Sequence, residues 1–322
     1  MVRDTIMVQS LPVNIRCEEY LFPGLKDYFD SLCRGKHLSL LNPLEIEVTV
    51  QSSPPTLPSG ASSVVETPIT QTFRQGSQYF FTSKDGSLVH FDSATRNCSA
   101  FIRPEIQNEM STICSLVSGP LIETMKLAGL FYLHAAGLWH NGIGYLISGD
   151  GGCGKTTSAL NLVRSGFDYV SDDSLLMDAR DGTIRVYPWY RDFHLTPDLC
   201  RRYGELDCLA LEHQSEEDKI SVDVSQYFQG SYRHWIEPDV IIFPRIRSHP
   251  TSVVLSLGHT DMFTRLIKQI LLASDPVTAE RQLETIKTLV GQTSGFELLG
   301  GRDLIEAPDT LVSLLKELPV RH

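Results

Sequence analysis

The segment Gly-Asp-Gly-Gly-Cys-Gly-Lys-Thr, residues 149–156, decides how the rest of the chain is interpreted. The apolar run before it, residues 144–148, is typical of a buried strand. After Lys155, apolar residues recur at helical spacing until Gly166, where the predicted helix ends. A glycine-rich loop between a strand and a helix is the setting of a phosphate-binding loop.

The composition of this loop predicts how it would hold a nucleotide. Its glycines allow the backbone N–H groups to turn toward one point, and the following helix adds the positive end of its dipole. Lys155 is expected to reach the outer phosphates, and Thr156 to place its hydroxyl on Mg²⁺. The alternative, a glycine turn that merely precedes a lysine, is disfavoured because the full pattern stands between a strand and a helix. The residues expected to bind the nucleotide are Gly149, Asp150, Gly151, Gly152, Cys153, Gly154, Lys155, Thr156 and Thr157.

Two carboxylates and one arginine are the next candidates for chemistry. Asp172 and Asp173 end the strand that is expected after the loop helix. Carboxylates beside a bound triphosphate have two tasks: one holds Mg²⁺ and the other takes the proton of an attacking hydroxyl. Arg245, which follows an apolar strand, could neutralise charge during phosphoryl transfer. The simpler interpretations are a cap or turn for the Asp pair and a surface ion pair for Arg245.

His134 lies on a strand that the Asn141-Gly142 turn folds back onto the strand before the loop. The two strands are therefore predicted to be antiparallel neighbours. In that position His134 could tune the protonation of one of the carboxylates. The simpler interpretation is a hydrogen-bonded core histidine.

The composition disfavours several classes of protein. The chain has 322 residues and a net charge of −11, which argues against non-specific binding of nucleic acid. Its first residues lack an apolar signal core, and no apolar run approaches the ~20 residues that a membrane span needs. Seven scattered cysteines without a Cys-x-x-Cys pair argue against a disulfide framework or a zinc site. These features predict a cytoplasmic protein without nucleic-acid or membrane partners.

The chain is predicted to have two regions. Residues 1–105 form a β-rich N-terminal region with a Pro- and Ser-rich loop at 51–68. Residues 106–322 form the nucleotide-binding domain, which has a helical C-terminal end. Further expected elements are a strand over 73–81 and, between 106 and 133, two helices of which Pro120 opens the second.

Three groups of residues together resemble a known family: His134-Ala-Ala-Gly, the phosphate loop with its flanking strand and helix, and Ser171-Asp172-Asp173. They resemble the HPr kinase/phosphorylase group and, more closely, HPr-kinase-related proteins of bacterial gene clusters such as lasso-peptide tailoring kinases. The arrangement also resembles the phosphoenolpyruvate-carboxykinase type of nucleotide-binding fold. The resemblance is strongest over residues 133–177. It implies an α/β fold with a P-loop core and a mixed, twisted sheet, beside the β-rich N-terminal region.

The resemblance also implies a role for each matched residue. Lys155 and Thr156 match the lysine and the hydroxyl of the family's phosphate loop. Asp172 matches the first Asp of the family's pair, taken as the catalytic base, and Asp173 matches the second, associated with the metal. His134 matches the histidine that assists the base. The Glu-Ile-Arg-Gly-Leu-Gly and Gly-Arg-Asn signatures of true HPr kinases are absent, so the resemblance leaves the phosphoryl acceptor open.

The sequence therefore predicts a kinase that uses Mg²⁺ and ATP, or another nucleoside triphosphate. The acceptor is expected to be a hydroxyl, on a serine or a C-terminal residue of a peptide or protein. Alternatives are a small-molecule alcohol kinase and a nucleotide-responsive binding protein with little transfer activity. The sequence leaves open whether the protein forms a homo-oligomer. The residues expected to carry catalysis are Asp172, His134, Lys155 and Arg245, with Thr156 and Asp173 at the metal.

Overall fold

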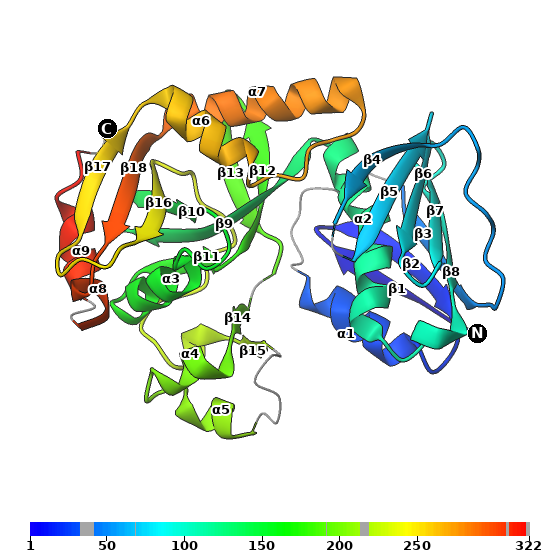
Figure 1. Cartoon of the computed structure of the whole chain (residues 1–322), viewed down its shortest axis with the longest axis horizontal. Helices are drawn as coiled ribbons and strands as arrows, with labels where there is room; N and C mark the ends of the chain where they lie inside the picture. The colour runs from blue at the N-terminus through cyan, green and yellow to red at the C-terminus, as the bar shows by residue number, and fades with distance from the viewer. Residues whose placement is uncertain (33–41, 68, 191, 213–218, 307–308, 320–322) are drawn as a thin grey trace. The chain divides into compact units, whose positions relative to one another are not determined.

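The computed structural model describes residues 1–32, 42–67, 69–190, 192–212, 219–306 and 309–319. The chain divides into two compact units (Figure 1). The first comprises Met1–Leu130 and Leu272–Glu280, and the second comprises Phe131–Leu271 and Arg281–His322. The predicted boundary after residue 105 differs from this division, because the first unit continues to Leu130 and takes in a later segment of the chain.

The first unit is built on a sheet whose described strands follow the order β1-β2-β3-β8-β7-β6-β5-β4. β3 pairs in parallel with β2 and with β8, whereas the other neighbours are antiparallel. The predicted β-rich N-terminal region is thereby confirmed. Its elements are β1 (Val2–Val8), β2 (Leu11–Cys17), α1 (Phe22–Ser31), β3 (Leu44–Val50), β4 (Ser62–Glu66), β5 (Thr70–Gln75), β6 (Gln78–Ser83), β7 (Leu88–Asp92), β8 (Asn97–Ile102), η1 (Pro104–Ile106) and α2 (Met110–Leu127).

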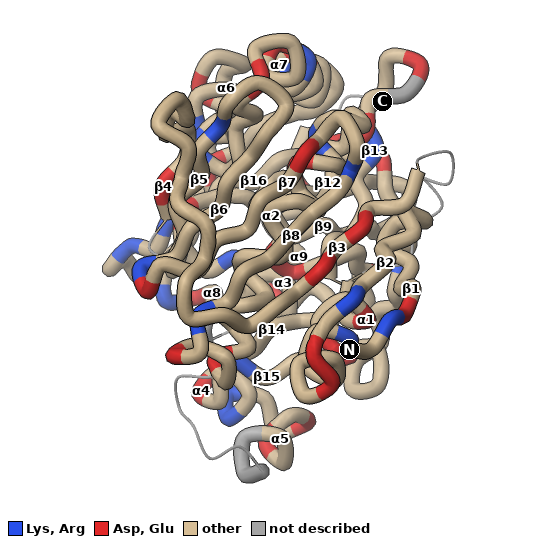
Figure 2. The backbone as a smooth tube through the Cα atoms, turned by 90° about the vertical axis from the view of Figure 1, so that its right-hand side faces the viewer, with Lys and Arg blue, Asp and Glu red and all other residues tan. Residues whose placement is uncertain are grey.

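One face of this sheet is polar along its first three strands. Successive residues of β3 alternate between buried and partly exposed, which is the pattern of a strand with one buried face. Arg3 forms an ion pair with Glu45 at 3.8 Å, and Arg16 forms one with Glu47 at 3.4 Å. Figure 2 shows basic positions of β1 and β2 in blue and acidic positions of β3 in red. Exposed ion pairs contribute little stability, so this face is a solvated surface.

The helix α2 explains why the first unit extends beyond residue 105. It packs on the sheet so closely that a Cβ added at Gly119 would lie 2.5 Å from the Phe81 ring. The two helices predicted around Pro120 are one continuous helix. An internal proline loses one backbone hydrogen bond and crowds the carbonyl one turn before it, but buried residues on both sides of Pro120 hold the helix against the sheet.

Two further expectations for this unit differ from the structure. The single strand expected over 73–81 is the hairpin β5–β6, which turns at Gly76 with a φ of +61°. The Pro- and Ser-rich loop at 51–68 contains β4, which pairs with β5 at the edge of the sheet. Because β4 is largely exposed, it lacks the alternating buried positions that reveal a strand in sequence. Pro68 lies outside the described residues.

The second unit is organised around a mixed sheet in the order β13-β12-β9-β10-β16-β18-β17, with β11 also paired to β9. β10, β16 and β18 are parallel, whereas β9 and β17 are antiparallel to their neighbours in this group. The predicted α/β architecture with a mixed sheet is confirmed. The strands are β9 (Leu130–His140), β10 (Ile143–Ser148), β11 (Asp168–Ser171), β12 (Ser174–Arg180), β13 (Thr183–Pro188), β14 (Phe193–Leu195), β15 (Ile220–Val222), β16 (Val240–Ile246), β17 (Val253–Leu257) and β18 (Ser294–Gly300).

Helices cover both faces of this second sheet (Figure 1). One hydrophobic core joins α3 (Lys155–Arg164) to Tyr145 and Ile147, and the other joins α6 (His259–Ile267) and α7 (Pro276–Gln292) to Leu146. Successive residues of β10 thus enter different cores, which explains the continuous apolar run of this strand. The remaining helices are α4 (Pro197–Arg201), α5 (Asp207–Glu212), η2 (Val224–Gln226), α8 (Asp303–Glu306) and α9 (Asp309–Lys316).

This architecture indicates where a ligand would bind. In α/β sheets, ligands bind beyond the carboxyl ends of parallel strands. The phosphate loop begins where β10 ends, and the end of its parallel neighbour β16 lines a cavity with the loop. Among the described residues, no helix has both the length and the apolar character required to cross a membrane.

Candidate functional site

The loop after β10 has the backbone that its motif predicts. Gly152 and Gly154 have φ angles of +76° and +99°, which disfavour any residue with a side chain. Gly154 is the N-cap of α3, and no side chain caps the helix. The N-terminal N–H groups of α3 are thereby left for an anion, which the positive end of the helix dipole would also attract.

Lys155 is the first residue of α3 and is 5% exposed. Its Nζ donates hydrogen bonds to the carbonyl oxygens of Gly149 at 2.8 Å and Asp150 at 3.2 Å. A buried ammonium group needs such partners. The lysine therefore folds back over the loop and places its charge where phosphate groups would bind.

Asp172 follows β11 and is almost completely buried, with 1% of its surface exposed. Burial, together with the neighbouring charge of Asp173, raises the pKa of the Asp172 carboxyl to about 7. The hydroxyl of Thr156 donates to its Oδ2 at 3.4 Å, while its Oδ1 has no hydrogen-bond partner. A buried, unpartnered carboxylate oxygen next to the loop threonine indicates a place where a cation would be stabilised.

Asp173 lies in a different environment, although it is the next residue. Its side chain is 34% exposed, and its Oδ1 lies 2.7 Å from His134 Nε2. Partial burial favours a higher pKa for Asp173, but the hydrogen bond and the charge of His134 outweigh it and lower the pKa. The structure thus pairs His134 with Asp173, whereas the resemblance had associated His134 with the base Asp172.

Gln269, just after α6, connects this pair to the phosphate loop and was not identified from the sequence. Its Oε1 lies 3.1 Å from His134 Nδ1, and its Nε2 donates to Asp150 Oδ1 at 2.9 Å. The backbone N–H of His134 also donates to the Gln269 carbonyl at 2.8 Å. One hydrogen-bonded chain therefore runs from Asp150 through Gln269 and His134 to Asp173.

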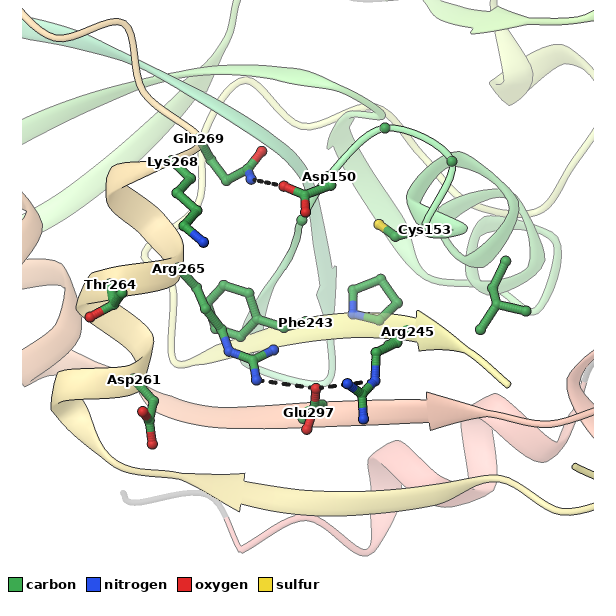
Figure 3. Close-up of a pocket in the computed structure, with 15 residues that line it drawn as sticks. Asp150, Cys153, Phe243, Arg245, Asp261, Thr264, Arg265, Lys268, Gln269 and Glu297 are labelled. Atoms are coloured by element: carbon green, nitrogen blue, oxygen red, sulfur yellow. Dashed lines mark hydrogen bonds and ion pairs between the residues drawn. The ribbon is translucent and has the colours of Figure 1, made fainter. Parts of the chain in front are cut away.

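A cavity of about 540 Å³ opens on one side of the loop (Figure 3). The first half of the loop, Gly149–Cys153, forms one wall, and the ends of β16 and α6 form the others. Arg245 lines this cavity beside the loop, and its side chain is 64% exposed. Its Nε is 3.7 Å from Glu297 Oε1, an oxygen that also accepts from Arg265 at 3.1 Å.

A smaller cavity of about 140 Å³ lies at the other end of the loop. It is mostly apolar and is lined by Thr157 and Asn161 of α3, Ile246 of β16 and Leu298 of β18. Asn161 accepts a hydrogen bond from the Tyr203 hydroxyl at 2.6 Å. The loop therefore adjoins two cavities, one lined by many charged side chains and one mostly apolar.

The residues around Asp172 fit a magnesium ion that is bound together with a nucleotide. Among the described residues, no cluster of three or more His, Cys, Asp or Glu side chains could hold a metal by itself. Mg²⁺ does not require such a cluster, because proteins usually bind it through one or two carboxylates plus substrate phosphates. The Thr156 hydroxyl and the unpartnered Oδ1 of Asp172 are hard oxygen ligands of this kind.

Comparisons with known proteins agree with the motif. No protein-family model matches the chain. HPr kinase/phosphorylases from two strains of Limosilactobacillus reuteri are 41% identical to it over 71 residues, which are 22% of this chain and 22% of theirs. The match thus spans about a fifth of the length of these curated relatives. A solved structure, the Hpr(Ser) kinase/phosphatase from Coxiella burnetii, has 16% sequence identity and a TM-score of 0.30, and the match covers 57% of this chain and 90% of that one.

The match to the HPr kinase/phosphorylases confirms the resemblance predicted from His134, the phosphate loop and the Asp pair. The closer resemblance to lasso-peptide kinases is not tested by these matches. Over the matched 71 residues, the chain is similar to the HPr kinase/phosphorylases.

Proposed function

We propose that this protein is an ATP- and Mg²⁺-dependent kinase that transfers the γ-phosphoryl group to a hydroxyl of a peptide or protein, on a serine or a C-terminal residue. The observation that carries the proposal is the convergence of three groups: the buried Lys155, the Thr156 hydroxyl and the Asp172 carboxylate. Phosphoryl transfer depends mainly on positioning and charge neutralisation, which is what a lysine, a hydroxyl and a carboxylate around a phosphate loop supply.

The two cavities suggest how the substrates would be arranged. The loop N–H groups and Lys155 would hold the phosphates. The apolar cavity beside Thr157 and Ile246 suits the nucleoside base. The larger cavity beside Gly149–Cys153 is then left for the part of the acceptor beyond its hydroxyl, because Asp173 is not among the residues that line it. Arg245 lines both cavities, which supports a role for it in neutralising charge on phosphates bound between them.

The contacts of the two aspartates favour Asp172 as the metal ligand and Asp173 as the general base, which reverses the roles implied by the resemblance. Asp172 adjoins Thr156 and has an unpartnered oxygen, so with Thr156 it would hold Mg²⁺, which neutralises phosphate charge when bound. Asp173 is more exposed and hydrogen-bonded to His134, so it would accept the proton of the attacking hydroxyl. Asp172 has the higher pKa, but a base must first reach its proton, and Asp172 is 1% exposed.

The test is mass spectrometry of acceptor pools incubated with the protein, ATP and Mg²⁺. The pools would be synthetic serine-containing peptides and a cell lysate, and the matched control is Asp173→Asn. A product heavier by one phosphate, formed at a rate about 10²-fold lower with the variant, supports the kinase. Nucleotide binding without a phosphorylated product in any pool would contradict it and favour a nucleotide-responsive binding protein.

A small-molecule alcohol is the second candidate acceptor. A volume of about 540 Å³ for the larger cavity lies in the range of small-molecule sites. The same measurement with a metabolite extract distinguishes the two acceptors, because the phosphate would then appear on a small molecule and on no peptide.

A further inference from the structure

Three basic side chains point into the larger cavity (Figure 3). Arg265 and Lys268 come from α6 and the residue that follows it, and Arg245 comes from the end of β16. Neither Lys155 nor Thr156 lines this cavity. The three cations are therefore not required to explain how the phosphate loop itself would bind a nucleotide.

The charges of these cations are only partly compensated. Arg245 and Arg265 share one carboxylate, Glu297, whose side chain is 12% exposed. Lys268 is exposed and, among the described residues, makes no hydrogen bond or ion pair. Three positive charges thus have one direct counter-charge. Arg265 is further held above the Phe243 ring, at 5.5 Å from its centroid, which fixes the position of its guanidinium group.

Two other carboxylates line the cavity, Asp150 and Asp261, and among the described residues neither forms an ion pair with Lys268, Arg265 or Arg245. Asp150 is hydrogen-bonded to Gln269 on the loop side. Asp261 stands near the start of α6 (Figure 3), seven positions before Lys268, which is a rise of about 10 Å along the helix axis. The space among Lys268, Arg265 and Arg245 therefore favours a negative group.

We propose that this space binds an oxyanion, a carboxylate or a phosphate, carried by the acceptor. The identification with the acceptor rests on the proposed kinase function, whereas the anion site itself does not. Arginine guanidinium groups match the planar geometry of such oxyanions, and a lysine adds a mobile point charge. The acceptor would thus be an anionic molecule, or an acidic segment of a peptide, whose hydroxyl faces the phosphate loop.

The test measures anion binding with the phosphate loop already occupied. The full-length protein is saturated with ADP and Mg²⁺ and then titrated with succinate or with inorganic phosphate, and binding is followed by calorimetry. Lys268→Met and Arg265→Lys are the variants. Lys287→Met is the matched control, because it removes an exposed lysine whose contact is the ion pair with Glu284 on α7.

The expected result is that the protein and the Lys287→Met control bind at least one anion. Lys268→Met and Arg265→Lys should each weaken that binding by about tenfold, the usual effect of losing a charged hydrogen-bond partner, with ADP affinity unchanged. Binding of succinate alone identifies a carboxylate, and binding of phosphate alone identifies a phosphate.

Three results would overturn the inference: no binding of either anion, binding that neither variant weakens, or a tenfold loss of ADP affinity in Lys268→Met, which would assign the cations to the nucleotide. If the unsubstituted protein fails to bind ADP, the proposed kinase function fails instead. The succinate titration still reports on the cavity in that case, because it does not require the nucleotide.

Discussion

The two sides of the phosphate loop differ in exposure and in charge. On the inner side, Lys155 and Asp172 are nearly hidden from solvent, and their partners are backbone carbonyls and the Thr156 hydroxyl. On the outer side, Arg245 and Lys268 line an open cavity. Buried polar groups tolerate little change, because any lost partner leaves an unsatisfied group. The inner side therefore suits the invariant part of a reaction, and the outer side suits a substrate that can vary.

The largest expected effect comes from Lys155→Met, which keeps the length of the side chain and removes its charge from the inner side. We expect phosphoryl transfer to fall by about 10³-fold, the usual scale for losing a preorganised charge at a phosphoryl group, and ADP binding to weaken. Transfer assays and ADP titration measure both. Transfer within tenfold of the unsubstituted protein would show that the loop does not work as a phosphate loop.

Asp173→Asn is expected to lower transfer by about 10²-fold, the effect of losing a general base, while nucleotide and Mg²⁺ binding are kept. Asp172→Asn should instead weaken the Mg²⁺-dependent part of nucleotide binding. Calorimetry with and without Mg²⁺, beside transfer assays, separates the two. The reverse pattern would restore the roles implied by the family resemblance, with Asp172 as the base.

The pKa of Asp172 predicts an effect of pH on stability in metal-free buffer. Burial and the charge of Asp173 hold this pKa at about 7, above the ~3.9 of an unfolded Asp. The native state then binds the proton more tightly, so the stability that this group contributes is complete below pH ~4 and is lost as the pH rises to about 7.

We therefore expect the free energy of unfolding to fall by about 2 kcal/mol more between pH 5 and pH 8 in the unsubstituted protein than in Asp172→Asn. Urea unfolding with EDTA present measures this difference. An equal fall in both proteins would mean that Asp172 does not titrate in this range.

A smaller effect on phosphoryl transfer is expected from a change at Gln269, which lies between the two sides of the phosphate loop. Gln269→Leu removes both side-chain hydrogen bonds that position His134 relative to Asp150. Transfer should drop by about tenfold through kcat, with the KM for ATP little changed, because each lost hydrogen bond costs about 1 kcal/mol. A change confined to KM would indicate that Gln269 contacts the nucleotide and not the base.

The smallest effect concerns the apolar cavity. Ile246 is 68% exposed and lines this cavity at the end of β16. Ile246→Ser should weaken ADP binding by about threefold, since only part of an apolar side chain would be covered by the base. Calorimetry with ADP and with inorganic pyrophosphate tests this, because pyrophosphate has no base and its affinity should not change.

The sequence was informative where structure depends on neighbouring residues. The phosphate loop, the hairpin at Asn141-Gly142 and the position of the Asp pair after β11 are local features, and their patterns predicted them. Gln269, Arg265 and Lys268 could not be identified, because they reach the loop only through tertiary contacts. One such contact is the bridge between Leu133 on β9 and Ile270. In sequence, the three residues look like the polar face and end of an ordinary amphipathic helix.

The sequence also could not show which of the two aspartates is hydrogen-bonded to His134. Asp172 and Asp173 lie in the bend between β11 and β12, where no regular strand alternation determines the direction of a side chain. Which of the two faces the interior depends on how β11 pairs with β9, where the register shifts between Tyr169 and Ser171. An irregularity of this kind leaves no mark in the pattern of apolar residues.

The parallel pairing of β10 with β16 has a consequence for the order of folding. The β9–β10 hairpin closes within a few residues, whereas Gly144 and Asp239, which are hydrogen-bonded at 2.7 Å, are 95 positions apart in the chain. Contacts between distant segments form late, because closing a long loop costs entropy first. Interactions that form after the transition state slow unfolding and leave the folding rate unchanged. A nucleotide bound to the loop would therefore lower the rate of unfolding and leave the rate of refolding unchanged.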